Sequence, residues 1–533
     1  MFQSSDIKLS HPDHLNDLLL VGNEKLTQED FKAAIVIYKK ILELLPHNLS
    51  VQLNLCVAYF KQGNILLAIQ ILTQIVKEHP NHGEAWNNLA KILRETGEIE
   101  TAIQCYKNAL HLLPNRSLIE SNMLFAYNYC ISKTPEEIAD VHIRWGENIS
   151  DPTIVQKLFS NKKDRNRPLR IGYVSPDFRT HALMFFIKPV IKNHHSKNFS
   201  IYCYSDTQFP DEETRFVQEH VPHFFSCHNI SDQALAKKIY DHRIDILVDL
   251  TGHSSKNRLL VFSQRPAPVQ VSYLGYQNTT GLKAINYYIT DNIISPPGLS
   301  DHLFAEQLFR LEDCFACFQP SDHAPNVNTS PLVQNDYITF GVLNNFSRMN
   351  DWMISAWMTL LKKVPTAKMI IQSRPFSDPS FIKKFLHRFD QQGIDPDRLN
   401  LYPYGSLDNF YHRHHDVDLI LDTYPDNGAS TLCQALWMGV PVLTCSGKTL
   451  ASRVGGSILH SLGLDDLITT SLDDYIQKAV DLSQHPEILI QLRKNLRQIL
   501  SQSTLFNAKQ FTQKLEAAYR KMWQIYCRRI IFQ

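Results

Sequence analysis

The sequence predicts an α plus α/β protein, in which an arm of helical repeats precedes two α/β lobes. A 34-residue repetition runs through the N-terminal part, and two successive series of short β-rich segments alternate with helical stretches after residue 169. The length of 533 residues also predicts several units, because single hydrophobic cores stop growing beyond about 250–300 residues.

Composition and charge narrow the class of protein. The formal net charge of +1 gives no global field for nucleic acid, so we expect no nucleic-acid partner. Residues 1–10 contain no apolar signal-peptide core, and no apolar run approaches the ~20 residues that span a bilayer. We therefore expect a cytoplasmic protein with reduced cysteines. Cys314 and Cys317 lack a second pair at zinc-site spacing, so we expect no metal site.

The repetition is typical of tetratricopeptide repeats, which are helical hairpins that bury their apolar faces by stacking. The positions that recur every 34 residues are Pro46, Pro80 and Pro114; Ala34, Ala68 and Ala102; Gly63 and Gly97; and Asn54, Asn88 and Asn122. We predict repeats over 15–130 after a tail at 1–14, with a fourth repeat that fades by about 130. Residues 131–168 are predicted to form a helical linker.

The recurring asparagines, Asn54, Asn88 and Asn122, have two interpretations. They either cap and bridge neighbouring hairpins, or they form a ladder of amides along the groove of the superhelix. An amide can donate to and accept from an extended peptide backbone, so the second interpretation predicts a binding site for an acceptor peptide.

The remaining chain reads as two lobes of parallel sheet covered by helices. Strands are predicted at 170–174, 199–204, 244–250, 269–273, 287–290, 337–343, 368–372, 399–402, 418–422 and 440–444. We place an N-terminal lobe at 169–319, a linker at 320–336, a C-terminal lobe at 337–505 and a final helix at 506–533. Ligands of such sheets bind at the carboxyl ends of the strands, so the functional residues should follow strands.

Three segments that follow strands carry polar residues suited to chemistry. Ser430 and Thr431 open a predicted helix, where free N–H groups favour a diphosphate, although a simple N-cap is the alternative. Arg348 ends a strand–turn segment and is either a phosphate partner or a solvated charge. Asp177 and His181 follow the first strand and could orient or deprotonate a hydroxyl, or serve only structure.

Together these segments resemble the protein O-GlcNAc transferases and their SPINDLY-type relatives, which join tetratricopeptide repeats to a GT-B region of two Rossmann-like lobes. The matching runs lie in family order at 170–178, 245–253, 265–276, 278–281, 340–348, 422–442 and 449–453. The resemblance covers about 170–525 and implies a glycosyltransferase that modifies protein Ser or Thr hydroxyls.

The resemblance also implies roles for individual residues. His181 would lie beside the donor sugar and the acceptor hydroxyl, with Asp177 near it. Arg348 stands where the family has a Lys on the departing diphosphate, and Asn345 accompanies it. The remaining donor-site positions are Ser430 and Thr431 on the phosphates and Leu274 and Gly275 at the sugar.

The implied reaction is inverting and needs no cofactor or metal, with UDP-GlcNAc as co-substrate and protein acceptors in the repeat groove. Asp416 and Asp418 form a DxD pattern, which some glycosyltransferases use to hold a metal. Because Asp418 leads into a buried strand, we interpret it instead as a cap or an ion-pair partner.

The chain departs from the family pattern at the nucleoside end of the site. Ala429 replaces a His, Gln434 replaces an acid on the ribose, and Phe410 aligns near a His at the base. Gln434 can still bond to ribose and Phe410 can still stack. Two alternatives stay open. One is a protein O-fucosyltransferase that uses GDP-fucose, because Thr251–His253 and Asn278–Gly281 look SPINDLY-like. The other is an inactive scaffold that binds partners through its repeats.

Overall fold

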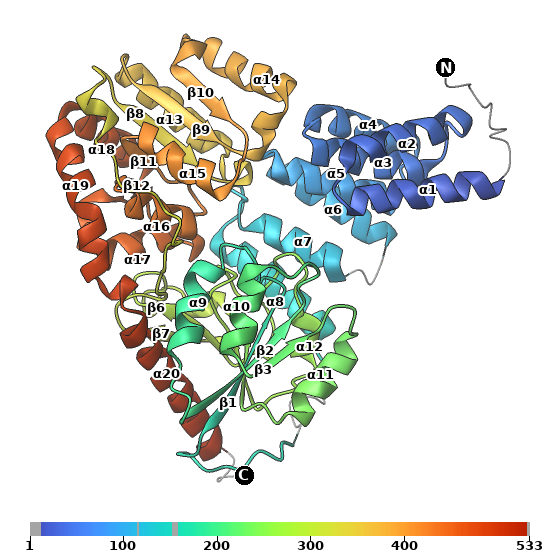
Figure 1. Ribbon diagram of the computed structural model, residues 1–533, viewed down its shortest axis with the longest axis vertical. Helices are drawn as coiled ribbons and strands as arrows, with labels where there is room; N and C mark the ends of the chain where they lie inside the picture. The colour runs from blue at the N-terminus through green and yellow to red at the C-terminus, as the bar shows by residue number, and fades with distance from the viewer. Residues whose placement is uncertain (1–11, 114–116, 152–157, 530–533) are drawn as a thin grey trace, which may run out of the picture.

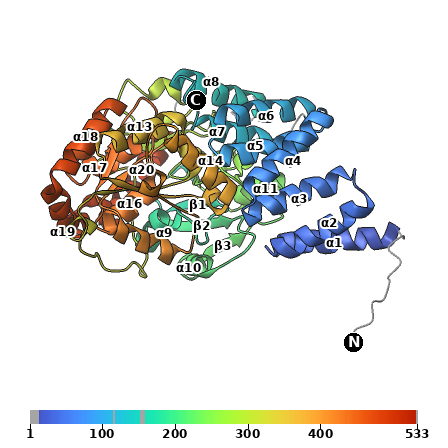
Figure 2. The same ribbon diagram turned by 90° about the horizontal axis from the view of Figure 1, so that it is seen from above.

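The computed structural model describes residues 12–113, 117–151 and 158–529, which form an arm and two lobes. The arm extends to one side of the lobes (Figure 1). Seen from above, its first helices α1 and α2 lie farthest from the lobes, whereas α7 and α8 lie against them (Figure 2). The order of arm, N-terminal lobe and C-terminal lobe confirms the predicted fold class.

The arm consists of helical hairpins, as the 34-residue period predicts. Its helices are α1 (Pro12–Thr27), α2 (Phe31–Leu44), α3 (Leu49–Gln62), α4 (Ile65–Glu78), α5 (Gly83–Glu95), α6 (Ile99–Leu112), α7 (Ser117–Tyr127) and α8 (Pro135–Ile149). The recurring alanines Ala34, Ala68 and Ala102 are fully buried, because only a small side chain fits between the packed helices. Within the predicted linker, Thr134 and Glu137 form a capping box that starts α8.

The N-terminal lobe is a seven-stranded parallel sheet in the order β3-β2-β1-β4-β5-β6-β7. Its strands are β1 (Leu169–Ser175), β2 (Phe199–Ser205), β3 (His223–Ser226), β4 (Ile246–Asp249), β5 (Val269–Ser272), β6 (Tyr287–Asp291) and β7 (Gln307–Leu311). Its helices are α9 (Met184–Asn193), α10 (Glu212–His220), α11 (Asp232–Asp241) and α12 (Leu259–Ser263).

The C-terminal lobe is a six-stranded parallel sheet in the order β10-β9-β8-β11-β12-β13. Its strands are β8 (Thr339–Leu343), β9 (Lys368–Gln372), β10 (Leu399–Tyr402), β11 (Leu419–Leu421), β12 (Val442–Cys445) and β13 (Ile468–Thr469). Its helices are α13 (Asp351–Lys363), α14 (Pro379–Asp390), α15 (Leu407–Arg413), α16 (Ala429–Trp437), α17 (Val454–His460), α18 (Leu472–Gln484) and α19 (Pro486–Gln502), with the 3₁₀ turns η4 (Phe346–Arg348) and η5 (Arg374–Ser377) near the site.

The last helix, α20 (Ala508–Arg529), returns to the N-terminal lobe and runs along it (Figure 1). Tyr519 and Trp523 are fully buried in the core of that lobe, and the Tyr519 hydroxyl lies 3.2 Å from the hydroxyl of Tyr173 on β1. The end of the described chain therefore belongs to the N-terminal lobe. Within the described residues, no helix is long and apolar enough to cross a membrane.

Candidate functional site

A cleft of about 1,260 Å³ lies where the arm and the two lobes meet. The N-terminal lobe contributes loops that follow β1, β2, β4 and β5, and the C-terminal lobe contributes η4, Arg374 and the start of α16. The arm contributes residues of α3, α5 and α7. Most of the lobe residues follow strands, as expected for parallel sheets.

The start of α16 presents backbone N–H groups to this cleft. The carboxylate of Asp422, just after β11, accepts hydrogen bonds from the N–H groups of Thr423 (2.9 Å) and Gly428 (3.0 Å), which folds the loop back to the helix. The N-cap residue Gly428 makes no side-chain cap bond, so the first-turn N–H groups keep their capacity for an anion. Ser430 lines the cleft, whereas the hydroxyl of Thr431 donates to the Gly428 carbonyl at 3.1 Å.

Arg348 lies in the cleft beside this helix and has a buried acidic partner. Its Nη2 lies 3.2 Å from Oδ1 of Asp426, and its Nη1 donates to the side-chain oxygen of Asn344 at 3.1 Å. Burial raises the pKa of Asp426 to about 6, although the Arg348 charge opposes that rise. The guanidinium is thus fixed by its neighbours near the N-terminus of α16. Asn345 also lines the cleft, and its side-chain oxygen accepts from the Tyr404 hydroxyl.

Asp177 and His181 face the same cleft from the loop after β1. Nδ1 of His181 lies 3.7 Å from Oδ2 of Asp177 and accepts the N–H of Leu183 at 3.3 Å. Burial lowers the pKa of His181, and the nearby Asp177 charge partly opposes the effect. A lowered pKa favours the neutral imidazole, which can accept a proton.

The loop after β5 is pressed tightly against the loop after β4. Gly275 has no space for a side chain, because a Cβ there would lie 1.7 Å from the carbonyl oxygen of Leu250. The preceding residue, Leu274, adopts a φ of 77°, which is uncommon for a branched side chain. Both residues line the cleft, and strained backbone of this kind is concentrated at functional sites.

The residues predicted to contact the nucleoside line the cleft less completely than those predicted to contact the phosphates. Ala429 lines the cleft, but Gln434 is buried in α16, and its side-chain oxygen has no hydrogen-bond partner. Phe410 does not line the cleft either, and its ring lies edge-on to His414 with centroids 4.8 Å apart. The structure does not bring Gln434 and Phe410 together with Arg348 in one open pocket.

The predicted asparagine ladder also divides into residues that line the cleft and one that does not. Asn88 and Asn122 line the cleft, so the arm presents two amides to it. Asn54 is absent from the lining, and its amide donates to the side-chain oxygen of Asn23 at 2.9 Å. That oxygen also accepts from the hydroxyl of Tyr38, so Asn54 belongs to a network inside the arm.

Two buried acids at the site did not emerge from the sequence. Asp426 pairs with Arg348, and Asp249 ends β4, where its carboxylate accepts from the N–H groups of Thr251 and Gly252. Burial raises the pKa of Asp249 to about 7. Their place at the end of β4 and in the loop after β11 was the available signal, but only the fold reveals the burial that raises their pKa values.

The DxD acids serve the structure of the C-terminal lobe. Asp418 is buried and accepts from the Ser330 hydroxyl at 2.6 Å and the Thr339 N–H at 2.9 Å, while Asp416 pairs with Arg413 at 3.1 Å. In the part of the chain that the structure describes, no group of three His, Cys, Asp or Glu side chains could hold a metal ion. All ten cysteines are free and buried.

Two Rossmann-like lobes that share a cleft, preceded by tetratricopeptide repeats, define a glycosyltransferase of the GT-B fold. Family models for tetratricopeptide repeats match residues 25–65, 51–82 and 83–116. The model for glycosyl transferase family 41 matches residues 151–328 and 329–515. The chain belongs to glycosyl transferase family 41.

Several proteins of known name are similar to the chain. It is 34% identical over 423 residues to "Probable UDP-N-acetylglucosamine--peptide N-acetylglucosaminyltransferase SPINDLY" of Solanum lycopersicum, which covers 78% of this chain and 45% of that protein. The Arabidopsis thaliana protein of the same name is 35% identical over 415 residues, or 76% and 45% of the two chains. The chain thus spans less than half the length of these relatives.

One similar solved structure matches this chain over nearly the whole length of both proteins. A mutant of the Thermobaculum terrenum O-GlcNAc transferase is 30% identical and superimposes with a TM-score of 0.90. The match covers 97% of this chain and 98% of that one. The arm and both lobes are therefore shared with that protein as one arrangement.

Proposed function

We propose that this protein is a protein O-GlcNAc transferase, which moves N-acetylglucosamine from UDP-GlcNAc to Ser or Thr hydroxyls of acceptor proteins. The observation that carries the proposal is the convergence of Arg348, the α16 N-terminus and the repeat arm on one cleft. The first two supply positive charge for a diphosphate, and the third offers a groove for a protein chain. The names of the similar proteins support the same donor and acceptor classes.

In the proposed reaction, the acceptor oxygen attacks the anomeric carbon from the face opposite the diphosphate. The bond from that carbon to the diphosphate breaks as the new bond forms, so the configuration inverts. The charge that develops on the leaving diphosphate is stabilised by Arg348 and the first-turn N–H groups of α16, without a metal. The neutral imidazole of His181 is the base that takes the hydroxyl proton.

The SPINDLY-like sequence motifs do not by themselves favour GDP-fucose as the donor. His253 bonds to Ser121 of α7 and to the Thr280 carbonyl, and Asn278 bonds to Asn128 of the arm. These contacts join the arm to the N-terminal lobe, and His253 also lines the cleft, so the contacts alone do not assign the sugar or the base. Donor identity depends instead on the nucleoside end, where Gln434 replaces the family acid.

Replacement of Arg348 by Ala tests the proposed role of the guanidinium. We expect kcat for sugar transfer to fall on the order of a hundredfold or more, because one electrostatic stabiliser of the leaving group is lost. Arg348→Lys should recover much of the rate, since it restores the charge that the family uses at this position. Thermal unfolding checks that both variants fold, and wild-type turnover by Arg348→Ala would contradict the assignment.

A panel of donors separates the proposed transferase from its alternatives. Donor hydrolysis, calorimetric binding and transfer to protein acceptors would be measured with UDP-GlcNAc, UDP-glucose and GDP-fucose. We expect UDP-GlcNAc to bind and to support transfer. A response only to GDP-fucose would replace the proposed donor, and no binding of any nucleotide would favour an inactive scaffold. The buried free thiols suit the reducing cytoplasm, where we propose that the acceptors are met.

A further inference from the structure

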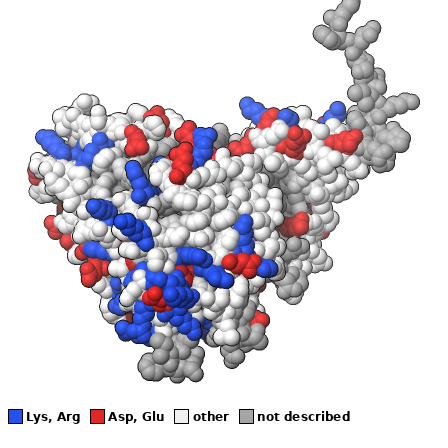
Figure 3. Space-filling view, turned by 60° about the horizontal axis from the view of Figure 1, so that its bottom comes forward, with Lys and Arg blue, Asp and Glu red and all other residues white. Residues whose placement is uncertain are grey.

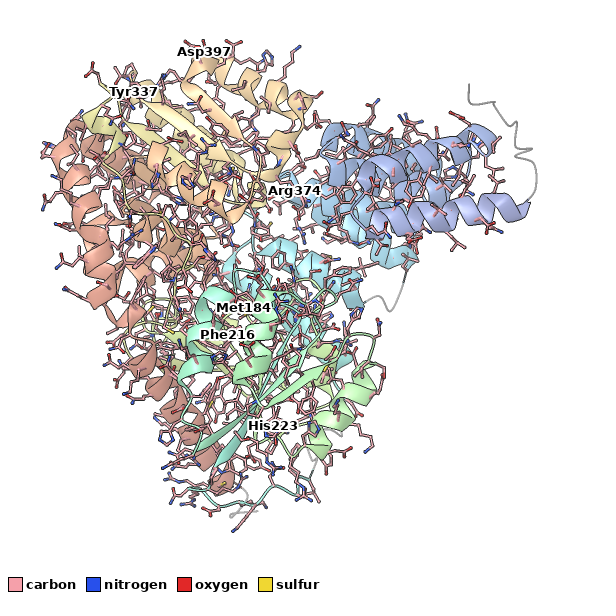
Figure 4. The ribbon with its side chains drawn as sticks, in the orientation of Figure 1. Met184, Phe216, His223, Tyr337, Arg374 and Asp397 are labelled. Carbon is pink, nitrogen blue, oxygen red and sulfur yellow. The ribbon has the colours of Figure 1, made fainter. Side chains whose placement is uncertain are left out.

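The arm side of the cleft carries several basic side chains among apolar residues and the acids Glu29 and Glu95. Lys61 lies at the end of α3, Lys91 and Arg94 lie on α5, and Arg374 belongs to η5 of the C-terminal lobe. Arg374 lies where that lobe meets the arm (Figure 4), and its guanidinium is 5.1 Å from the centre of the Phe60 ring. These cations therefore form one wall, which we call the basic wall and define as Lys61, Lys91, Arg94 and Arg374.

Most of the basic wall has no direct ion-pair partner, although Glu29 and Glu95 line the same cleft and partly offset its charge. Arg94 pairs with Glu95 at 3.1 Å, but Lys61, Lys91 and the Arg374 guanidinium have no ion pair or hydrogen bond among the described residues. Burial and the neighbouring Arg374 charge lower the pKa of Lys61. Burial and the neighbouring Arg94 charge do the same for Lys91. The repulsion among such like charges is relieved when an anion enters between them, so the free energy of the cluster falls.

The basic wall differs from the basic side chains on the outer surface. Figure 3 shows Lys and Arg gathered on the outer surface with acidic side chains among them. Exposed charges of that kind are hydrated and screened. In the cleft, walls of low dielectric concentrate the field, and Asn88 lies within the same surface. The amide can hold a peptide backbone, while the cations can select its side chains.

We propose that the acceptor is an acidic protein segment, whose Asp or Glu side chains beside the modified Ser or Thr dock on Lys61, Lys91 and Arg374. The inference rests on the proposed function for the existence of an acceptor, and it names the class of that acceptor. Each docked carboxylate gains a charge-assisted hydrogen bond in a partly enclosed groove, whereas a basic segment meets repulsion there.

Binding of short fluorescein-labelled peptides by the full chain tests this proposal directly. Each peptide has one central Ser, and the residues on both sides of it are Glu, Gln or Lys in three otherwise identical sequences. By fluorescence anisotropy at low salt, we expect the Glu peptide to bind at least about tenfold more tightly than the Gln peptide, and the Lys peptide most weakly. The difference should shrink as ionic strength rises.

Charge reversal of the wall supplies the decisive comparison. Lys61→Glu combined with Lys91→Glu should invert the order of the Glu and Lys peptides and leave calorimetric UDP binding unchanged. Lys77→Glu combined with Lys107→Glu is the matched control, because these exposed lysines have the same spacing on the outer helices α4 and α6. If the reversed wall fails to fold, the pair Lys61→Gln and Lys91→Gln should still weaken the preference for the Glu peptide, with Arg374 left to hold part of it.

The outcomes separate this inference from the proposed function. Equal binding of the three peptides by a protein that transfers sugar to them would overturn the acidic acceptor and keep the transferase. Preferential binding of the Glu peptide without transfer from any donor would keep the basic wall and overturn the transferase. A weaker UDP affinity in the reversed wall would assign these cations to the donor instead of the acceptor.

Discussion

The arm is joined to the two lobes by contacts of very different character. On the N-terminal lobe, Leu124 of α7 and Trp145 of α8 share a hydrophobic core with residues of the lobe. Beside that core, Nε2 of the buried His142 lies 2.6 Å from the Tyr276 hydroxyl. The junction is therefore packed and polar at once, like the interior of a single domain.

The junction with the C-terminal lobe combines separate polar contacts with a close approach of Gly97 to the Phe346 ring. The carboxylate of Asp378 caps α14 through the Ser380 N–H at 2.8 Å, and its other oxygen accepts the Leu66 N–H of α4 at 2.9 Å. Arg374 over Phe60 and the partly buried Leu66 add to this contact. We therefore expect the arm to move with the N-terminal lobe when the lobes open, so that the acceptor groove shifts relative to the phosphate site.

The largest expected effect comes from a change at the packed junction. A Cβ on Gly281 would lie 1.9 Å from the carbonyl oxygen of His142 on α8, so Gly281→Ala should force the arm from the lobe. We expect several kcal/mol of destabilisation, because backbone must shift. Gly298→Ala is a matched control: it has the same φ of 78° but no atom within 4 Å of the added Cβ.

Thermal melting of the two glycine variants compares how much stability each substitution removes. Gly298→Ala should lower the midpoint only slightly, since a left-handed backbone costs an L side chain roughly 1–2 kcal/mol. Gly281→Ala should lower it far more and increase proteolytic cleavage between the arm and the lobe. Equal shifts in the two variants would mean that the close approach at Gly281 is readily relieved.

Most of the secondary structure could be predicted from the sequence, because it depends on local patterns. The ten predicted strands agree with the structure within two residues at each end. The missed strands are β3, β7 and β13: the first two are edge strands with partly exposed faces, and the last has only two residues. Such strands lack the buried apolar run that distinguishes central strands.

Residues that line the cleft could be predicted only where they follow a strand closely in sequence. Ser430 and Arg348 lie after strands, so the fold rule found them. The capping of α4 by Asp378 could not be found in this way, because Leu66 and Asp378 are 312 residues apart in sequence. The same applies to Asn54, whose 34-residue period matches Asn88 and Asn122, but whose amide bonds to Asn23.

An effect of intermediate size is expected when the pH is lowered, because His142 lies at the junction of the arm with the N-terminal lobe. Burial lowers the pKa of His142 to about 4, against about 6.5 in an unfolded chain. Between these values the unfolded state binds more protons, so stability falls as the pH falls, by about 3 kcal/mol in total for this group. His253 is in ring contact with His142, and burial also lowers its pKa.

The His142→Gln variant tests this contribution. We expect it to be less stable than the wild type at pH 7, because the bond to Tyr276 is weakened. Its stability should nevertheless fall less steeply between pH 6.5 and 4, as measured by urea unfolding at several pH values. Buried acids such as Asp249 make stability depend on pH in the opposite direction. They are present in both the wild type and His142→Gln, so their contribution cancels when the two pH profiles are subtracted. Parallel pH profiles would remove His142 as an acid-sensitive group.

The smallest expected effect comes from the polar junction with the C-terminal lobe. Asp378→Ala should remove a cap from two helices that belong to different parts of the molecule, at about 1 kcal/mol for each. Asn48→Ala is the control, because Asn48 caps only α3 through the Val51 N–H. Hydrogen exchange should become faster in the first turns of both α4 and α14 in Asp378→Ala, but only in α3 in the control. The His142–Tyr276 junction should keep its protection, since the arm stays attached to the N-terminal lobe. If Asp378→Ala also exposed that junction, the two contacts would form one cooperative unit, and the arm would not move with one lobe alone.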